Sequence, residues 1–212
     1  MQDKISFSQV LGSLKAVLGK LEEKRKELDR LDSPIGDGDH GRTISNAFQK
    51  LTPLFESSEE DIGVLLKKVG RTLALSAGAA AGPLYGTAFM EAGKVVEGKK
   101  EIDLGDMVKM AQAFEEGIKR RGKAEVGEKT MLDTVHPAVE SLKKSLSENL
   151  SLEDALKNMK EEAKRGMEST KDLISQRGRS SRLGERTRGH IDPGAASCYY
   201  IIEAMVDFLL SS

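Results

Sequence analysis

Residues 7–28 read FSQVLGSLKAVLGKLEEKRKEL, and their apolar side chains recur at the spacing of one helix face. Val10, Leu14, Val17, Leu21 and Leu28 lie whole or nearly whole helical turns apart, whereas Lys, Glu and Arg fill most positions between them. The pattern predicts a long amphipathic helix. Similar spacing recurs along the chain, and no run alternates at the period of two that indicates a strand. We therefore expect an all-α protein.

Helix start and stop signals give the expected boundaries. A capping-box pattern over residues 57–60 precedes the third helix, Pro83 suits the first position of the fourth, and Asp192 with Pro193 opens the eighth. Pro137 implies a kink or a later start in the sixth. The expected helical segments are 7–28, 44–51, 62–73, 83–98, 107–118, 131–146, 152–159 and 193–210. Eight helices with mostly short connections predict a single-domain bundle over residues 1–212, with antiparallel neighbours.

Charge and cysteine content exclude several classes of protein. The chain has 33 Lys and Arg against 34 Asp and Glu, so no overall positive field attracts nucleic acid or an anionic membrane. Its one cysteine, Cys198, cannot form an internal disulfide, and no secretory signal is evident, which favours the cytoplasm. Residues 72–90 are uncharged, but small residues and a Gly-Pro break argue against a membrane span.

The connection after the first helix is rich in aspartate and glycine. Residues 31–41, LDSPIGDGDHG, contain a literal G-x-G-x-x-G, but a charged helix precedes it where a dinucleotide fold needs a strand. A calcium loop fails because Gly41 occupies its third ligand position after Asp37 and Asp39. Asp32, Asp37 and Asp39 suit Mg²⁺ with phosphate, or they only form turns and helix caps. The spacing leaves both readings open.

Three further features are candidate functional groups with structural alternatives. His40 either contacts a phosphate or is a structural hydrogen-bonding group. The small residues of 76–86, SAGAAAGPLYG, either let a ligand approach the backbone or let two helices pack closely. Residues 177–190 carry five arginines, suited to phosphate or an acidic partner, or simply solvated.

Four segments together resemble a known family. They are LDxxIGDGDHG (31–41), SAGAAAGPLYGTAFMEAG (76–93), RGKAEVGEKTMLD (121–133) and GRSSRLGERTRGHIDPGAAS (178–197). In this order along a helical chain, they closely resemble the nucleotide-binding L subunits of dihydroxyacetone kinases. The resemblance covers most of the chain, from about Asp32 to the last helix, and implies an eight-helix antiparallel barrel with the nucleotide at one end.

The resemblance also implies site residues. It makes Asp32, Asp37 and Asp39 ligands of two Mg²⁺ ions and assigns no catalytic residue beyond the metal and phosphate site. One position departs from the family, which often has serine where this chain has Ala81, so only a backbone N–H is available there. The implied nucleotide-binding residues are His40, Gly41, Arg42, Thr43, Ala80, Ala81, Gly122, Met131, Arg179, Asp192, Pro193 and Gly194.

Chain length favours one branch of the family. ATP-consuming dihydroxyacetone kinases resemble fusions with a substrate-binding domain, for which 212 residues leave no room. The phosphotransferase-system type keeps ADP or ATP as a tightly held coenzyme. A phosphohistidine on the M subunit rephosphorylates it, and the γ-phosphoryl passes to dihydroxyacetone on the K subunit, within glycerol and dihydroxyacetone metabolism. The resemblance thus implies these two partner subunits, and a homodimer is left open.

Two alternatives to this function remain at the level of sequence. One is an ATP-dependent kinase subunit for a related ketose or a fatty acid, with freely exchanging nucleotide. The other is a non-enzymatic helical carrier or regulatory protein, in which the aspartates bind nothing. Retention of nucleotide through purification distinguishes these readings.

Overall fold

The computed structural model describes residues 3–56, 60–76 and 81–212, and the expected all-α class is confirmed. Three short 3₁₀ helices, η1 (Thr52–Glu56), η2 (Thr170–Asp172) and η3 (Ser180–Thr187), lie in connections. The α-helices are α1 (Phe7–Asp32), α2 (His40–Gln49), α3 (Ile62–Ser76), α4 (Ala81–Lys94), α5 (Leu104–Gly122), α6 (Leu132–Ser147), α7 (Leu152–Ser169) and α8 (Pro193–Ser211).

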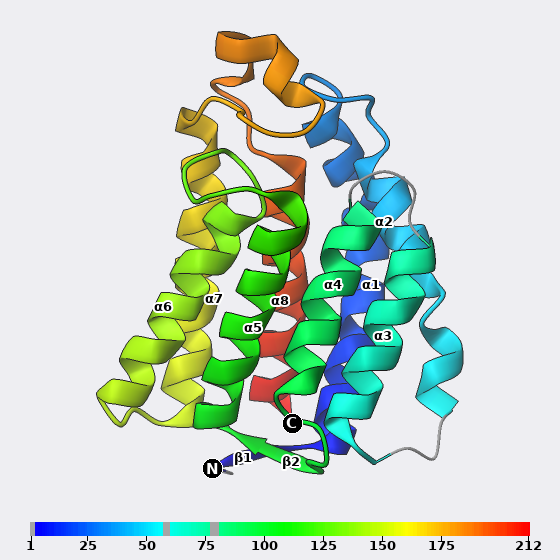
Figure 1. The fold of residues 1–212 in the computed structure, drawn as a ribbon, viewed down its shortest axis with the longest axis vertical. Coiled ribbons are helices and arrows are strands. Elements are labelled where there is room, and N and C mark those ends of the chain that lie inside the picture. The colour runs from blue at the N-terminus through cyan, green and yellow to red at the C-terminus, as the bar shows by residue number, and fades with distance from the viewer. Residues whose placement is uncertain (1–2, 57–59, 77–80) are drawn as a thin grey trace.

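The helices form a closed antiparallel barrel, as expected (Figure 1). Each helix packs on its neighbours along the chain, and α8 returns to pack on α1. The seam between these two holds a Lys20–Glu203 ion pair at 3.0 Å and a hydrogen bond of 2.8 Å from the Tyr200 hydroxyl to Glu27. The barrel is filled by apolar side chains from every helix, including Leu14, Phe48, Leu66, Tyr85 and Val139.

The alternating helix directions determine where the connections lie. Residues 33–39, 123–131 and 170–192, which follow α1, α5 and α7, are gathered at one end of the barrel together with the start of α4 (Figure 1). We call this the site end. Both chain ends lie at the opposite end, which we call the far end. Segments that are distant in sequence thereby share one surface because odd-numbered helices all finish at the same end.

The far end carries two strands that the sequence analysis did not expect. β1 (Lys4–Ser6) pairs antiparallel with β2 (Glu101–Asp103), and Ile5 lies opposite Ile102. Both isoleucines are buried. The hydrophobic pattern did not reveal these strands because three residues are too few to establish a period of two.

The boundaries of α4 differ from those expected. The described part of the helix already includes Ala81 and Gly82, so Pro83 is not its first residue as expected. The helix ends at Lys94, and a turn follows that contains Gly98 at φ +85°, so the expected end at Gly98 was also wrong. The capping box expected over residues 57–60 includes Ser57, which lies outside the described residues.

Helix α6 runs through Pro137 without a later start. Proline lacks the N–H that would bond the carbonyl of Asp133, four residues earlier. Gly166 of α7 lies against that carbonyl, and a Cβ on Gly166 would be 2.1 Å from the Asp133 oxygen. The proline is therefore accommodated where a glycine lets the neighbouring helix approach.

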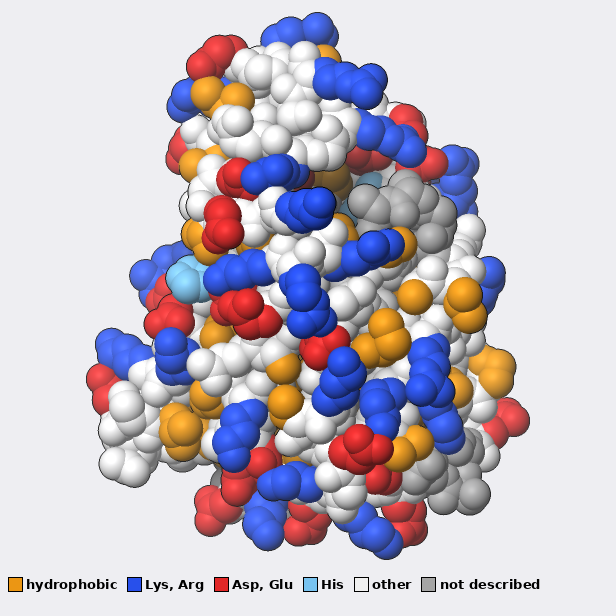
Figure 2. All heavy atoms as spheres, viewed as in Figure 1, with side chains coloured by type: hydrophobic (Ala, Val, Ile, Leu, Met, Phe, Trp, Pro, Cys, Tyr) orange, Lys and Arg blue, Asp and Glu red, His pale blue; other side chains and the backbone are white. Residues whose placement is uncertain are grey.

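Helix α8 begins as the sequence predicted. Asp192 is its N-cap and accepts a hydrogen bond of 2.7 Å from the Ala195 amide, and Pro193 is its first residue. Within the described part of the chain, α8 alone is long and apolar enough to cross a membrane, but half of it is buried in the barrel, as in a core helix. On the face seen in Figure 2, basic and acidic side chains are interspersed.

Candidate functional site

The site end contains a cavity of about 550 Å³. Its wall is built from the three connections described there and from the starts of α2, α4 and α8. The structure therefore brings together residues from all four segments quoted above. The predicted site residues that line the cavity are Asp32, Asp37, Asp39, His40, Thr43, Ala81, Gly122, Met131, Arg179, Asp192, Pro193 and Gly194.

Two predicted residues are not among those that line the cavity, and one is not described. Gly41 packs against α1, where a Cβ would lie 2.0 Å from the carbonyl oxygen of Arg25. The amide of Arg42 donates to Asp29 Oδ1 at 3.0 Å, and its exposed side chain lies 3.8 Å from Asp39. Neither residue lines the cavity. Ala80 lies outside the described residues.

The three aspartates converge at one edge of the cavity. One carboxylate oxygen from each of Asp32, Asp37 and Asp39 lies within 4.8 Å of the others. Asp32 is buried, and its Oδ2 accepts a hydrogen bond of 3.0 Å from the Asp39 amide, which fixes the curvature of the loop. Gly36 permits this curvature, because a Cβ there would meet Asp32 Oδ1 at 2.0 Å. Such a set of hard oxygen donors fits Mg²⁺.

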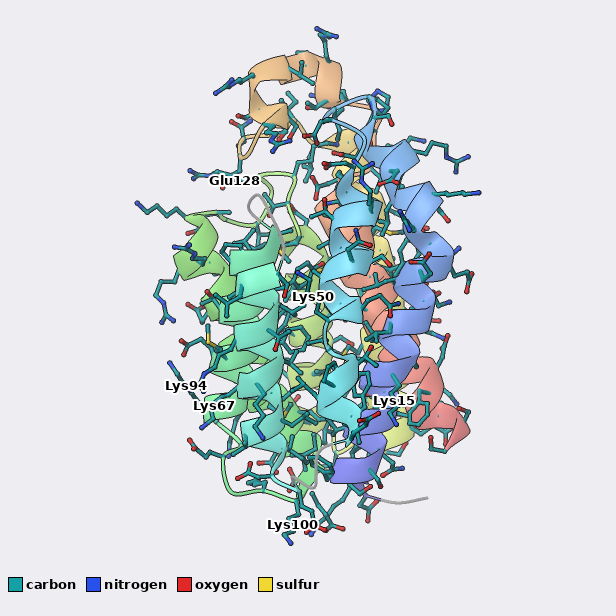
Figure 3. The ribbon with its side chains drawn as sticks, turned by 90° about the vertical axis from the view of Figure 1, so that its right-hand side faces the viewer. Lys15, Lys50, Lys67, Lys94, Lys100 and Glu128 are labelled. Atoms are coloured by element: carbon teal, nitrogen blue, oxygen red, sulfur yellow. The ribbon has the colours of Figure 1, made fainter. Side chains whose placement is uncertain are left out.

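Two ion pairs join the arginine-rich connection, residues 177–190, to the other two connections at the site end. Arg179 forms an ion pair with Asp37, and Arg177 makes a bidentate pair with Glu128, at 2.7 Å through Nε and 2.9 Å through Nη2. Figure 3 shows Glu128 at the site end, whereas Lys100 lies at the far end. These pairs are partly exposed, so each contributes little to stability.

The imidazole ring of His40 contacts α8 through Ser197. Its Nε2 lies 2.9 Å from the Ser197 hydroxyl, which is also 2.8 Å from the hydroxyl of buried Tyr85. Loss of hydration lowers the pKa of His40 to about 4, against the opposing effects of Asp32 and Asp29. The ring is therefore neutral near neutral pH. Ser197 also donates to the Gly194 carbonyl at 3.0 Å, which ties the ring to the first turn of α8.

Asp192 and Lys129 are ionisable groups in a poorly hydrated part of the wall. Desolvation raises the pKa of Asp192 to about 7, although amide hydrogen bonds and the charge of Lys129 oppose the rise. Desolvation also lowers the pKa of Lys129. The lysine is 1% exposed and its backbone has φ +60°. Both groups face the junction between the connection 170–192 and α8.

Several residues of the site were not predicted from the sequence. Lys129 lies inside a quoted segment, yet lysines are usually exposed and nothing in the sequence marks it as buried. Tyr85 and Ser197 also lie in quoted segments, but their contact joins residues 112 positions apart. An apolar part of the wall, formed by Ile35, Leu84, Ile118, Ala124 and Met131, gives the cavity a side suited to a flat apolar group.

The cavity thus has three chemically different parts. Carboxylates at one edge can hold a divalent cation, Arg179 supplies positive charge beside them, and another part of the wall is apolar. A ligand that combines an anionic, metal-binding end with a flat ring fits this order.

Comparison with known proteins identifies the family. The family model described as the DAK2 domain matches residues 34–207. The chain belongs to the DAK2 domain family. The resemblance stated from the sequence is confirmed by relatives that cover nearly the same length.

The PEP-dependent dihydroxyacetone kinase, ADP-binding subunit DhaL, of Escherichia coli strain K12 is 36% identical over 95% of this chain and 96% of that protein. The PTS-dependent dihydroxyacetone kinase, ADP-binding subunit DhaL, of Lactococcus lactis is 38% identical over 90% of this chain and 93% of that protein. The names of both relatives agree with the expected enzyme class.

Solved structures of the dihydroxyacetone kinase of C. freundii share the fold. The native form has a TM-score of 0.74 and 25% identity, and covers 94% of this chain. A complex of that kinase with AMP-PNP and Mg²⁺ has a TM-score of 0.69 and 24% identity over the same 94%. This chain spans about a third of each kinase chain, 34% in both comparisons.

Proposed function

We propose that this DAK2 domain protein is the ADP-binding subunit of a phosphoenolpyruvate-dependent dihydroxyacetone kinase. Its nucleotide, held with two Mg²⁺ ions, acts as a coenzyme in the cytoplasm. A phosphohistidine of an M subunit recharges ADP to ATP, and the γ-phosphoryl passes to dihydroxyacetone on a K subunit. The observation that carries the proposal is the convergence of Asp32, Asp37 and Asp39 at the edge of a cavity whose wall also has an apolar part.

The relatives support the same assignment. The Escherichia coli and Lactococcus lactis proteins are named as ADP-binding subunits, and this chain covers almost all of each. The C. freundii kinase, which has the same fold, binds AMP-PNP and Mg²⁺. A nucleotide has an anionic end, which suits a cation held by the carboxylates, and a flat ring, which suits the apolar part of the wall.

Phosphoryl transfer requires that the reacting groups are aligned and that the phosphate charge is neutralised. Different residues of the cavity would meet these two requirements. Asp32, Asp37 and Asp39 would hold Mg²⁺, which supplies positive charge to the phosphate oxygens when bound. Arg179, which pairs with the Asp37 carboxylate, would add positive charge near the phosphates. The apolar wall around Leu84 and Met131 would receive the base and exclude water from it.

In the proposed function, neutral His40 is a positioning residue and not a carrier of the phosphoryl group. Its Nε2 is engaged by Ser197, so the ring is fixed by α8 and not by the ligand. No covalent intermediate on this chain is required, because the phosphoryl group moves between the nucleotide and the two partners. We expect no phosphohistidine at His40 during turnover, and rapid-quench mass analysis of the protein tests this directly.

Retention of nucleotide tests the proposal. The purified protein is denatured, and the supernatant is chromatographed for ADP and ATP. Stoichiometric nucleotide supports the coenzyme role, and slow replacement by added radiolabelled ADP confirms that it is held. Fast exchange with intact ATP-dependent turnover would favour a kinase subunit that uses ATP as a substrate. Absence of nucleotide, together with no binding of added MgADP, would contradict both and favour a non-enzymatic protein.

Phosphoryl flow tests the partner assignment separately. The protein is mixed with phosphoenolpyruvate, the general phosphotransferase proteins and purified M and K subunits of the E. coli system, with dihydroxyacetone as acceptor. Dihydroxyacetone phosphate should form only when all subunits are present. Formation from ATP alone, without an M subunit, would overturn the proposed donor. Substituting erythrulose for dihydroxyacetone measures how far the K subunit sets the acceptor.

A further inference from the structure

Lys129 is a lysine in a place that lysine rarely occupies. Its side chain is 1% exposed, and its backbone adopts φ +60°, a left-handed conformation uncommon for a residue with a Cβ. Burying an ammonium group is unfavourable unless its donors are satisfied. The position is therefore held by specific contacts on the surrounding chain.

Those contacts close the base of the arginine-rich connection. The ammonium of Lys129 donates to the backbone carbonyls of Thr170 and His190, which stand at the two ends of residues 170–190. Close by, the Gly189 amide donates to the Lys171 carbonyl at 2.7 Å. One side chain from the α5–α6 connection thus joins the start and the finish of the segment that carries Arg177 and Arg179.

The same junction leads to the first turn of α8. The Asp192 amide donates to the Thr170 hydroxyl oxygen at 3.0 Å, and Asp192 in turn caps Ala195. The charge of Lys129 acts on Asp192, and Asp133 and Asp172 also act on the lysine. Displacement of Lys129 would therefore disturb both the arginine segment and the cavity wall at residues 192–194.

The loop that presents Lys129 is itself anchored. The Asp133 carboxylate accepts hydrogen bonds from the Gly127 amide at 2.6 Å and from the Thr130 amide at 2.7 Å. These bonds fix the residues on either side of Lys129 to the start of α6. The lysine therefore extends from a rigid support and does not follow the arginine segment passively.

We propose that Lys129 is a positioning residue for nucleotide binding, which clamps residues 170–190 at their base and so holds Arg179 and the Asp192–Gly194 turn against the ligand. This inference rests on the proposed function. It assigns Lys129 no contact with the reacting phosphates, because the two ammonium hydrogen bonds that define its place go to backbone carbonyls.

Three variants test the clamp. Lys129→Met removes the ammonium but keeps a long side chain, and Lys129→Arg keeps charged donors. Lys123→Met is the matched control, because Lys123 has φ +50° in the same connection but is exposed. Binding of MgADP is measured by calorimetry after removal of any bound nucleotide. Amide hydrogen exchange is followed by mass spectrometry without nucleotide, and far-UV circular dichroism checks folding.

We expect Lys129→Met to bind MgADP roughly tenfold more weakly, as suits the loss of hydrogen bonds from a charged group. Exchange should accelerate in residues 171–191 and stay unchanged in 33–39. Lys129→Arg should restore much of the affinity, and Lys123→Met should match the wild type. Wild-type affinity in Lys129→Met would overturn the proposal, and so would faster exchange spread evenly over the barrel, which indicates a purely structural role.

A fourth variant covers the case in which Lys129→Met does not fold. Thr170→Val keeps the shape of Thr170 but removes the hydroxyl that accepts from the Asp192 amide, so it breaks the same junction at another point. Thr170→Val should lower the affinity for MgADP and accelerate amide exchange in residues 171–191, as Lys129→Met does. Wild-type affinity and exchange would overturn the proposal. If the wild-type protein binds no MgADP, the proposed function fails, and the exchange comparison still decides whether Lys129 clamps the segment.

Discussion

The two ends of the barrel are built from different kinds of contact. At the far end, Asp103 and Asp106 form a capping box at the start of α5, and β1 pairs with β2, so these polar groups have the hydrogen-bond partners usual for a helix start and a strand pair. At the site end, a lysine is buried in a left-handed conformation and a carboxyl group has a pKa near 7. Three carboxylates also converge there.

The contrast shows where the protein trades stability for a binding surface. Convergent like charges and desolvated ionisable groups are unfavourable in the free protein, and a ligand of opposite charge relieves them. Substitutions at the site end should therefore change ligand affinity more than folding. Substitutions at the far end should do the reverse.

The largest expected effect is that of Asp37→Ala. Loss of one of the three carboxylates proposed to bind Mg²⁺ should lower the affinity for MgADP by roughly a hundredfold or more, so that nucleotide is no longer retained through purification. Stability should change little, because Asp37 is exposed. Glu168→Ala serves as the control, because Glu168 is an exposed carboxylate near the end of α7 at the same end of the barrel and does not line the cavity. Full phosphoryl transfer by Asp37→Ala with ADP still bound would contradict the assignment.

Asp106→Ala, at the far end, should lower the stability of the protein and leave its affinity for MgADP unchanged. Buried Asp106 accepts from Lys99 at 2.6 Å and from the Asp103 amide at 3.4 Å, so its removal leaves both donors without this partner. We expect the free energy of unfolding to fall by about 1.5 kcal/mol, with unchanged MgADP affinity. Urea denaturation and calorimetry measure the two quantities. Asp3→Ala is the exposed control, and weakened nucleotide binding in Asp106→Ala would break the contrast between the ends.

The smallest effect concerns the pH dependence contributed by Asp192. Its pKa is higher in the folded protein than in the unfolded chain, so the folded state holds the proton more tightly. Its contribution to stability is present at low pH and is lost as pH rises through about 4 to 7.

Asp192→Asn keeps an oxygen for the helix cap but does not titrate. We expect its free energy of unfolding, relative to the wild type, to rise by about 1 kcal/mol from about pH 5 to about pH 8, after allowance for the partial exposure of the site. Urea titrations of the nucleotide-free protein at the two pH values measure the difference. A constant difference would show that Asp192 is already ionised at the lower pH.

The helices were predictable because local signals repeat many times within each one. The spacing of Val10, Leu14, Val17 and Leu21 marks α1, and Asp192 with Pro193 marks the start of α8. Short elements were not predictable, since β1 and β2 depend on pairing between residues about 100 positions apart. Pro83 did not mark the first residue of α4, because the described part of the helix already includes Ala81 and Gly82.

The candidate site was predictable as segments but not as contacts. The aspartates and the arginines stood out by composition, and most of the residues implied by the family line the cavity. The burial of Lys129 and the orientation of Gly41 toward α1 depend on how separate helices approach one another. No spacing within a single segment carries that information.

The closure of α8 on α1 has a consequence for how the chain folds. Gly12 of α1 lies where a Cβ would be 2.2 Å from the ring of Phe208, so the two helices fit directly against each other. The other neighbouring helices meet their partners within a few tens of residues, but α1 meets α8 only after almost the entire chain has been synthesised. We therefore expect the contact between α1 and α8 to form after the contacts between helices that are neighbours in sequence.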